Sequence, residues 1–373
     1  MPPAESGDQT FPKVGYQIEI SDQPEDTAWD GFLNDISAGH LAQTSVWGQL
    51  KGGLKRSAAR VTATREGQIV GGAQLLIRPL PVGGTIAYIP RGPVLAMDDQ
   101  DLAQAVMTGI HQILKEHRIK YLVVQPPLPY PHLTPLLRQR NYRPSSMVVA
   151  SAATIQVDLQ KPLADVASGM GKTPRRFIRR GPQRGLTSRE GTVEDLPTFY
   201  RLMTLTCERQ NFSHFPESYF ADMWRLLHPP GFLKLFIVEH QGEPVSAQLV
   251  ITFGNTVVAK YKGWSGKHKQ LGPNIFMDWM IIEWAHSQAY HAYDFEGIEL
   301  DTANQLADGQ LQPHEVAYGP TRYKMNFGGQ VVFFPTAYDY VRNPILRWGH
   351  AHIFPRISQS TFLRRLVHRL RTS

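Results

Sequence analysis

Two stretches in the second half of the chain place lysine, tyrosine and carboxylate side chains beside glycine turns. The longer stretch runs from Tyr261 to Ile298, and the shorter one, YKMNFGG, runs from Tyr323 to Gly329. In the shorter stretch an ammonium group fixed at Lys324 could stabilise a developing oxyanion or contact a phosphate. Gly328 and Gly329 would let the backbone turn close to a ligand. The alternative is a lysine in a late strand that extends into solvent.

The elements that must position these residues are a strand, a loop, a helix and a second strand. A strand ending at Tyr261-Lys262-Gly263 leads through a polar loop to a helix that opens near Asn274. Apolar residues in that helix recur with a period near 3.6. A short strand, Tyr293–Phe295, follows and ends at Gly297. This order resembles the acyl-binding half of the acetyltransferase-like (GNAT) fold.

Coenzyme A is the usual acyl carrier of that fold, and backbone N–H groups of a glycine-rich loop at a helix start hold its pyrophosphate. The loop of the second half, Lys269–Asn274, has one glycine, and Pro273 lacks an N–H donor where the cradle needs one. The loop of the first half, Pro90–Pro93, is no better suited. We therefore expect a different acyl donor and no cofactor.

The pattern of predicted elements occurs twice. Two helices, a hairpin, a strand, a helix and a strand are predicted near residues 30–124 and again near residues 193–295. Glu66-Gly67 marks the hairpin turn of the first copy, and Gln241–Glu243 marks that of the second. Such a repeat indicates two copies of one α/β domain.

Six short motifs follow one another between about Gln43 and Gly329. They are QTSVWGQLK, YIPRGPV, RRFIRR, YKGWSG with LGPN, YDFEGI and YKMNFGG. In this order they resemble the FemABX family. The resemblance implies an α/β (α+β) fold with two tandem GNAT-like domains, at residues 16–158 and 159–329, after a disordered lead-in at 1–15. Residues 330–373 would pack back on the first domain, and the helical-hairpin arm of some FemA-like members is expected to be absent.

Members of the FemABX family are non-ribosomal peptidyltransferases that move an amino acid from aminoacyl-tRNA onto a peptidoglycan precursor. The resemblance implies that this chain is a monomeric aminoacyltransferase. It would act on an amino group of the stem peptide of lipid II or UDP-MurNAc-pentapeptide and so build the interpeptide bridge. One alternative keeps the tRNA donor and changes the acceptor to an antibiotic or another peptide. The others are an acyl-CoA-dependent N-acyltransferase and a non-catalytic protein that binds RNA or a membrane.

The resemblance assigns roles to individual residues. Lys324 matches a functionally important lysine of the family and is the candidate catalytic residue, with Tyr323 beside it as a candidate for substrate binding. Lys51 lies four residues after Trp47 and matches a lysine that contacts the diphosphate of a nucleotide-linked muropeptide in one family member. Charge-assisted hydrogen bonds suit that role. The alternative is a solvated lysine at a helix end.

The second domain offers further candidates for substrate binding. Tyr219 matches a family tyrosine that follows the pair of helices, and Tyr261 ends the strand before the polar loop. The arginine that often stands four residues before this tyrosine is replaced by Phe215, with His214 adjacent. This departure leaves the second phosphate contact open, and His214 or Arg209 could supply it.

Three residues have both a structural and a functional interpretation. Arg91 stands between two prolines in YIPRGPV, where it could bind substrate or form a structural salt bridge. Gln125 replaces an acid that the family often has after the last strand of the first domain, and an amide cannot accept a proton, so no general base is assigned. Asp294 ends a strand, where it could hydrogen-bond the turn at Gly297 or contact substrate.

Composition limits the class of protein. The apolar content of 42% supports two cores in 373 residues. No apolar run approaches the ~20 residues that span a bilayer, and no secretory signal is visible, so we expect a cytoplasmic protein. A single cysteine, Cys207, excludes an internal disulfide. The fourteen histidines, with His111 and His117 isolated, show no metal-binding spacing, so we predict no metal.

The net charge of +7 lies entirely in the last residues of the chain. Residues 342–373 contain seven arginines and no acid or lysine, so residues 1–341 sum to zero. Residues 360–373 can form a basic amphipathic helix, which suits peripheral contact with an anionic membrane surface, at the inner face of the plasma membrane, or with an RNA backbone. The alternative is a helix packed on the body with a solvated basic rim.

Overall fold

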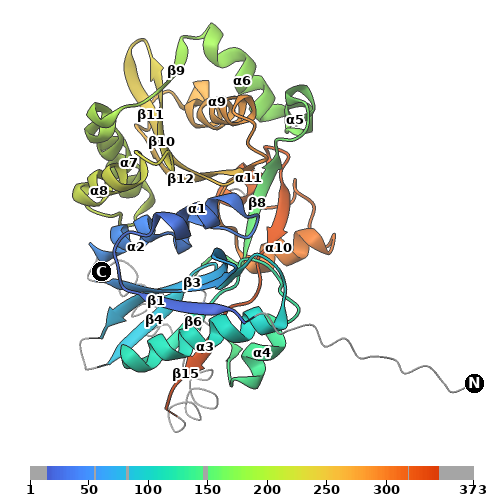
Figure 1. The fold of residues 1–373 in the computed structure, drawn as a ribbon. Helices are drawn as coiled ribbons and strands as arrows, with labels where there is room; N and C mark the ends of the chain where they lie inside the picture. Colours follow the sequence, from blue (N-terminus) through green and yellow to red (C-terminus); the bar gives the residue numbers. More distant parts are fainter. Residues whose placement is uncertain (1–14, 54–55, 81–83, 146–149, 318, 344–373) are drawn as a thin grey trace, which may run out of the picture.

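The computed structural model describes residues 15–53, 56–80, 84–145, 150–317 and 319–343. Its strands form two separate sheets, each flanked by helices (Figure 1). Strands between residues 17 and 144 build the first sheet together with one strand at residues 338–341, and strands between residues 153 and 333 build the second. Residues 1–14 of the lead-in predicted at 1–15, and the predicted amphipathic helix at residues 360–373, lie outside the described residues.

The first sheet has the strand order β1-β2-β3-β4-β6-β15-β7, with the short β5 beside β3. Its elements in chain order are β1 (Gln17–Ser21), α1 (Thr27–Asp35), η1 (Leu41–Gln43), α2 (Ser45–Gly52), β2 (Ser57–Arg65), β3 (Gln68–Pro79), β4 (Thr85–Ile89), β5 (Val94–Leu95), α3 (Gln100–Glu116), β6 (Ile119–Val124), α4 (Leu133–Gln139) and β7 (Arg143–Pro144), with β15 (Tyr338–Val341) returning from the end of the described chain.

The second sheet has the order β14-β8-β13-β12-β11-β10-β9. Its elements are β8 (Ala153–Asp158), α5 (Leu163–Gly169), α6 (Lys172–Gln183), β9 (Leu186–Glu190), η2 (Val193–Asp195), α7 (Leu196–Gln210), α8 (Glu217–Leu227), β10 (Leu233–His240), β11 (Glu243–Phe253), β12 (Thr256–Trp264), η3 (Lys269–Leu271), α9 (Pro273–Ser287), β13 (Ala292–Asp294), α10 (Leu300–Ala307), α11 (Pro320–Met325) and β14 (Gln330–Phe333).

The repeated order of elements predicted from the sequence is present in both sheets. A hairpin is followed by a strand, a helix and a strand that pairs in parallel, as β4, α3 and β6 in the first sheet and as β12, α9 and β13 in the second. In both hairpins the predicted turn residues Glu66-Gly67 and Gln241-Gly242 have positive φ, which matches the twist of the flanking strands.

Strand pairing differs from the boundary predicted at residue 158. The predicted boundary would assign β8 to the first domain, but β8 lies between β13 and β14 in the second sheet. Its inward residues Ala153, Ile155 and Val157 are buried in the same apolar cluster as α9, so their burial favours this sheet. Strand β15, in turn, pairs with β6 and β7 in the first sheet. The change of sheet therefore falls between β7 and β8, and among the described strands only β15 returns from the second sheet's part of the chain to the first sheet.

Helices cover both faces of the second sheet. Helices α7 and α8 lie on the face toward the first half of the chain, where α8 packs on α2 (Figure 1). Helices α5, α6 and α9 cover the opposite face. Because α9 lies between the sheet and α6, most of its residues are buried. Asp278 is one of them, although it carries a carboxylate.

Candidate functional site

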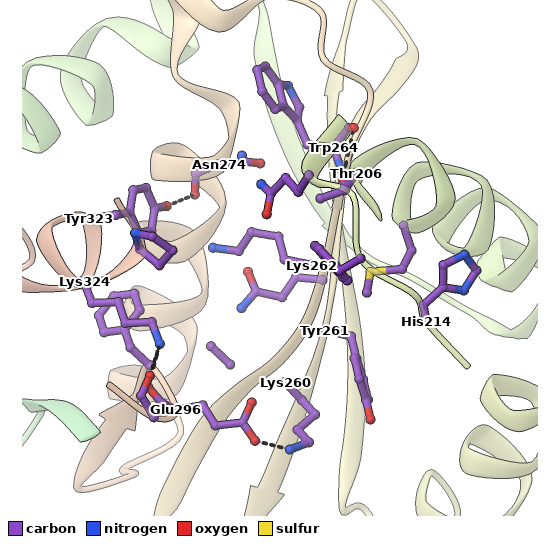
Figure 2. A pocket seen from close by; sticks show the side chains of 18 of the residues that line it. Thr206, His214, Lys260, Tyr261, Lys262, Trp264, Asn274, Glu296, Tyr323 and Lys324 are labelled. Atoms are coloured by element: carbon purple, nitrogen blue, oxygen red, sulfur yellow. Dashed lines mark hydrogen bonds and ion pairs between the residues drawn. The ribbon is translucent and has the colours of Figure 1, made fainter. Parts of the chain in front are cut away.

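The site begins where two neighbouring strands of the second sheet separate. Strands β12 and β13 pair only from Thr256 opposite Ala292 to Val258 opposite Asp294. Beyond this point β12 continues, while the chain after β13 turns away. Lys260 is the extra residue of a β-bulge, and such a bulge bends its strand and redirects side chains. A cavity of about 790 Å³ opens between the separated segments (Figure 2).

Lys324 lies on the wall of this cavity and is held by two backbone carbonyls. Its Nζ donates hydrogen bonds of 2.7 Å to the carbonyl oxygens of Glu296 and Gly297 (Figure 2). An ammonium has three donors, so one N–H remains for a ligand. Burial lowers the pKa of Lys324, and the nearby carboxylates of Glu296 and Asp294 oppose that shift. The geometry suits a cation that is positioned before any substrate arrives.

The local structure around Lys324 corrects the sequence interpretation. The residues are not in a strand, because Pro320–Met325 form the short helix α11. Gly328 does adopt positive φ, but a side chain there would meet the backbone of Gly169 in α5 at 2.5 Å. Gly329 similarly packs against the backbone of Gln156 in β8. These glycines therefore allow close packing within the protein and do not approach the cavity.

A second lysine, Lys262, is held by a buried carboxylate that sequence reasoning did not identify. Asp278 on α9 is fully buried and accepts hydrogen bonds from Lys262 and from the hydroxyls of Tyr293 and Tyr323. Burial, and then the charge of Asp278, hold the pKa of both tyrosines well above the usual range. The tyrosines therefore remain neutral donors, and the hydroxyl oxygen of Tyr323 also lies 2.9 Å from the carbonyl oxygen of Asn274 (Figure 2).

The turn after β13 presents a carboxylate to the cavity. Asp294 is buried and accepts hydrogen bonds from Thr154 and Gln156 and from the backbone N–H of Glu296. Glu296 has φ of 57°, an unusual conformation for a residue other than glycine that is found at strained functional turns. Its carboxylate pairs with Lys260 (Figure 2). Among the described lining residues, Glu296 is the one carboxylate. Asp294 thus shapes the turn that presents it.

Lys51 lies where α2 of the first half meets α8 of the second. Its Nζ donates 2.7 Å to the hydroxyl of Tyr219 and lies 4.5 Å, 5.4 Å and 5.0 Å from the ring centroids of Trp47, Phe215 and Tyr219. Desolvation lowers the pKa of this lysine to about 7, and the charge of Arg56 adds to the effect. The three rings counteract this, because their faces attract a cation. Phe215 itself lines the cavity, so this aromatic cage adjoins it.

Other residues that the sequence predicted for the site lie next to this aromatic cage. Phe215 stacks on Tyr219 with ring centroids 4.1 Å apart, and Tyr261 meets Phe215 edge-on. His214 lines the cavity beside Phe215, and its Nδ1 lies 2.7 Å from the Phe215 carbonyl oxygen (Figure 2). The structure therefore brings His214, Tyr261, Tyr323 and Lys324 to one cavity, with Lys51 and Tyr219 beside it.

Arg91 and Gln125 do not line the cavity. Arg91 is buried, donates 2.9 Å to the carbonyl oxygen of Ser151 and stacks 3.4 Å over the ring of Phe334. Burial lowers its pKa to about 10. Gln125 accepts a hydrogen bond from the hydroxyl of Tyr88, and its backbone joins the loop after β4. Both residues join segments of the chain in this structure, and a substrate contact by either remains a prediction.

The glycines of the two loops considered for coenzyme A are packed against protein. A side chain at Gly272 would lie 2.6 Å from the ring of Phe177 in α6, and one at Gly92 would lie 2.6 Å from the amide of Gln43. Glycine at these two positions therefore allows close packing within the protein.

In the part of the chain that the structure describes, no group of three or more histidine, cysteine or acidic side chains is arranged to hold a metal ion. Within the same residues, no helix combines the length and the apolar character needed to cross a bilayer.

Two family models match different parts of the chain. Residues 25–141 match the model described as the FemAB family, and residues 170–325 match the model described as an acetyltransferase (GNAT) domain. The first match covers most of the first sheet, and the second covers every residue that lines the cavity except Ser151.

Curated proteins that resemble this chain include lipid II:glycine glycyltransferases of staphylococci. The protein from Staphylococcus saprophyticus is 26% identical over 244 residues, which cover 62% of this chain and 58% of the relative. The protein from Staphylococcus aureus strain MRSA252 is 26% identical over 221 residues, which cover 56% of this chain and 52% of the relative. The matched region thus spans little more than half the length of these relatives.

Solved structures show the same fold. The crystal structure of FemX covers 88% of this chain and 99% of its own, with a TM-score of 0.78 and 19% identity. A tandem GNAT protein from the clavulanic acid biosynthesis pathway covers the same shares, with a TM-score of 0.51 and 13% identity. The tandem GNAT-like fold and the resemblance to the FemABX family, both predicted from the sequence, are confirmed.

Sequence reasoning missed Lys260, Lys262, Asp278 and Glu296 as parts of the site. Lys262 lies in the motif YKGWSG and Glu296 in YDFEGI. A charged residue directly before a glycine at the end of each predicted strand could have indicated both as site residues. Asp278 gave a weaker signal, as one acid in an otherwise apolar helix segment. Its partners are separated from it by 15 to 45 residues, so only the folded chain shows the network.

Proposed function

Starting from the confirmed FemABX resemblance, we propose that this chain transfers an aminoacyl group from aminoacyl-tRNA to an amino group of a peptidoglycan precursor at the cytoplasmic face of the membrane. The observation that carries the proposal is Lys324, an ammonium fixed by two carbonyls on the wall of a cavity with one donor left over. The relatives named as lipid II:glycine glycyltransferases support lipid II as the acceptor.

In the proposed reaction, the acceptor amine attacks the ester carbonyl carbon at the end of the tRNA. The carbonyl oxygen gains negative charge in the tetrahedral intermediate, and the free N–H of Lys324 donates to it. Because Lys324 is already held in place, it need not reorganise as the charge develops. The carbon–oxygen bond to the ribose then breaks, an amide remains, and the ribose hydroxyl leaves protonated.

The attacking nitrogen must lose a proton during this reaction. Glu296 is the proposed acceptor, because its carboxylate reaches the cavity at the turn beside Lys324. The ion pair with Lys260 keeps that carboxylate in place. A proton taken by Glu296 can pass to the leaving ribose oxygen, which balances the transfer without a metal or a cofactor.

The precursor has a place next to the cavity in this proposal. Lys51 lies in an aromatic cage without a carboxylate in hydrogen-bonding contact among the described residues. A diphosphate that reached it would supply the missing anion. The cavity would then receive the stem peptide of the same precursor, while the diphosphate stayed at the boundary between the two halves of the chain.

Incubation of the protein with lipid II and tRNA charged with radiolabelled glycine tests the proposal. The expected result is label in lipid II that depends on intact charged tRNA and disappears when RNase is added first. Label that persists after RNase, or transfer from an acyl-CoA in place of the tRNA, would contradict it. UDP-MurNAc-pentapeptide in place of lipid II distinguishes a nucleotide-linked acceptor from a lipid-linked one.

A further inference from the structure

Helix α6 carries a dense row of cations that the proposed reaction does not use. Their spacing of three and four residues places them on one face of the helix, and all of them are exposed. The members of this cationic face are Lys172, Arg175, Arg176, Arg179 and Arg180.

This cationic face lacks counter-charges. Among the described residues, no ion pair involves any of its members, and the sequence has no acid between Asp165 and Arg189. Like charges three and four residues apart on a helix repel each other by a few tenths of a kcal/mol per pair. The arrangement is therefore unfavourable for the isolated protein and favourable for one that binds a polyanion.

The opposite face of α6 packs on the protein itself. Phe177 covers Gly272 at the start of α9, Gly181 packs on Phe276, and Pro174 is buried. A helix that binds a membrane surface inserts its apolar face into the lipid. Because the apolar face of α6 is already buried against α9, a bilayer is a poor partner for this helix. An array of guanidinium groups at helical spacing suits phosphates along a nucleic-acid backbone.

The position of α6 connects it to the cavity. Its capping residue Gly171 donates a backbone hydrogen bond to the carbonyl oxygen of Asn326, two residues after the catalytic candidate Lys324. Helix α6 also contacts η3, which ends the loop that starts at Trp264 on the cavity wall. Figure 1 shows α6 beside α9 on the outer side of the second sheet. Trp264 and the exposed Phe212 line the cavity and offer aromatic surfaces for unpaired bases.

We propose that the cationic face of α6 binds the phosphodiester backbone of an RNA duplex whose unpaired end enters the cavity past Trp264 and Phe212. This inference rests on the proposed function, since it assigns the surface that holds the duplex part of the tRNA donor. In this proposal α6 binds the duplex, and the residues of the cavity carry out the transfer reaction.

A triple variant, Arg175→Gln, Arg176→Gln and Arg179→Gln, tests the inference in the full-length protein. The probe is a fluorescent RNA hairpin that ends in single-stranded CCA, and its Kd is measured by anisotropy over a range of salt concentrations. Each phosphate contact contributes roughly 0.7 to 0.9 to the slope of log Kd against log salt, so the variant should lose about two to three from that slope. With charged tRNA, the KM for tRNA should rise while the KM for lipid II stays unchanged.

The matched control removes the same number of exposed cations from the first half of the chain, as Lys115→Gln, Arg118→Gln and Arg138→Gln. This control should bind RNA like the wild type. The α6 variant should melt at the wild-type temperature or slightly above, because it loses like-charge repulsion. A hairpin without the CCA end should bind more weakly than the full probe but keep its salt slope.

Several results would overturn the inference. If the α6 variant and the control bind the hairpin equally well, α6 does not hold the duplex, even when the wild type transfers from charged tRNA. If the α6 variant loses binding to phosphatidylglycerol vesicles but not to RNA, the partner is a membrane. If wild-type protein binds the hairpin through α6 yet transfers nothing from charged tRNA, the proposed function fails while the RNA surface stands.

Discussion

Replacement of Lys324 by methionine separates the charge of this residue from its packing. The variant loses two hydrogen bonds of 2.7 Å from a charged donor, and such bonds contribute about 1.5–3 kcal/mol each. The loss is offset because a buried ammonium no longer has to be desolvated, and because water in the cavity can hydrate the two carbonyls. The net free energy of unfolding should therefore fall by only about 1–2 kcal/mol, which lowers Tm by a few degrees.

The rate of aminoacyl transfer should fall much more than the stability. Loss of one positioned donor to an oxyanion typically costs about 2.7–4 kcal/mol of transition-state stabilisation, or roughly 10²–10³ in rate. Single-turnover transfer from charged tRNA to lipid II measures this rate directly. Lys161→Met is a suitable control, because Lys161 is exposed and its 3.6 Å ion pair with Asp158 is of the kind that contributes about 0–1 kcal/mol.

The pH dependence adds an independent test. Burial lowers the pKa of Lys324, and only its protonated form can stabilise an oxyanion. The rate should therefore decline as pH rises through a pKa below the ordinary lysine value, and this decline should be absent in Lys324→Met. A Lys324→Met rate within about tenfold of wild type, or a fall in Tm large enough to explain the lost rate by unfolding, would refute the reasoning.

Three further variants test the rest of the site. Asp278→Asn removes the buried acceptor of Lys262 and should lower the free energy of unfolding, measured by calorimetry, by about 3–5 kcal/mol. The double variant with Lys262→Met should lose less stability than the sum of the two single losses, because both changes remove the same ion pair. Lys51→Met should have a higher Tm than wild type at about pH 6, because the folded wild type must bury a charged ammonium there. The difference in Tm should shrink as pH rises from about 7 toward 10.5. Over that window the folded wild type has lost the proton that its unfolded chain keeps, which stabilises the wild type. A difference in Tm independent of pH would show that Lys51 is not desolvated. Glu296→Gln should slow transfer from charged tRNA to lipid II by at least about 10², because the amide cannot take the proton that the attacking nitrogen loses. A rate within about tenfold of wild type would show that Glu296 does not accept the proton.

Much of the architecture could be predicted from the sequence. The hairpin turns, the 3.6-residue period of α9 and the duplicated order of elements are local patterns, because turn chemistry and helix amphipathicity depend on residues close together in the chain. The motifs that carry the family resemblance are also short, and the matches to the FemAB and GNAT models agree with them. Lys324 and Tyr323 could be nominated for the same reason.

Tertiary structure decided the features that depend on distant residues. Pairing alone placed β8 in the second sheet and β15 in the first, because a short apolar strand fits either sheet until its neighbours are known. The hydrogen bond from Lys51 to Tyr219 joins residues 168 positions apart. The network around Asp278 gathers donors from β12, β13 and α11. Such contacts cannot be predicted from composition or from spacing along the chain, because they form only when the elements pack together.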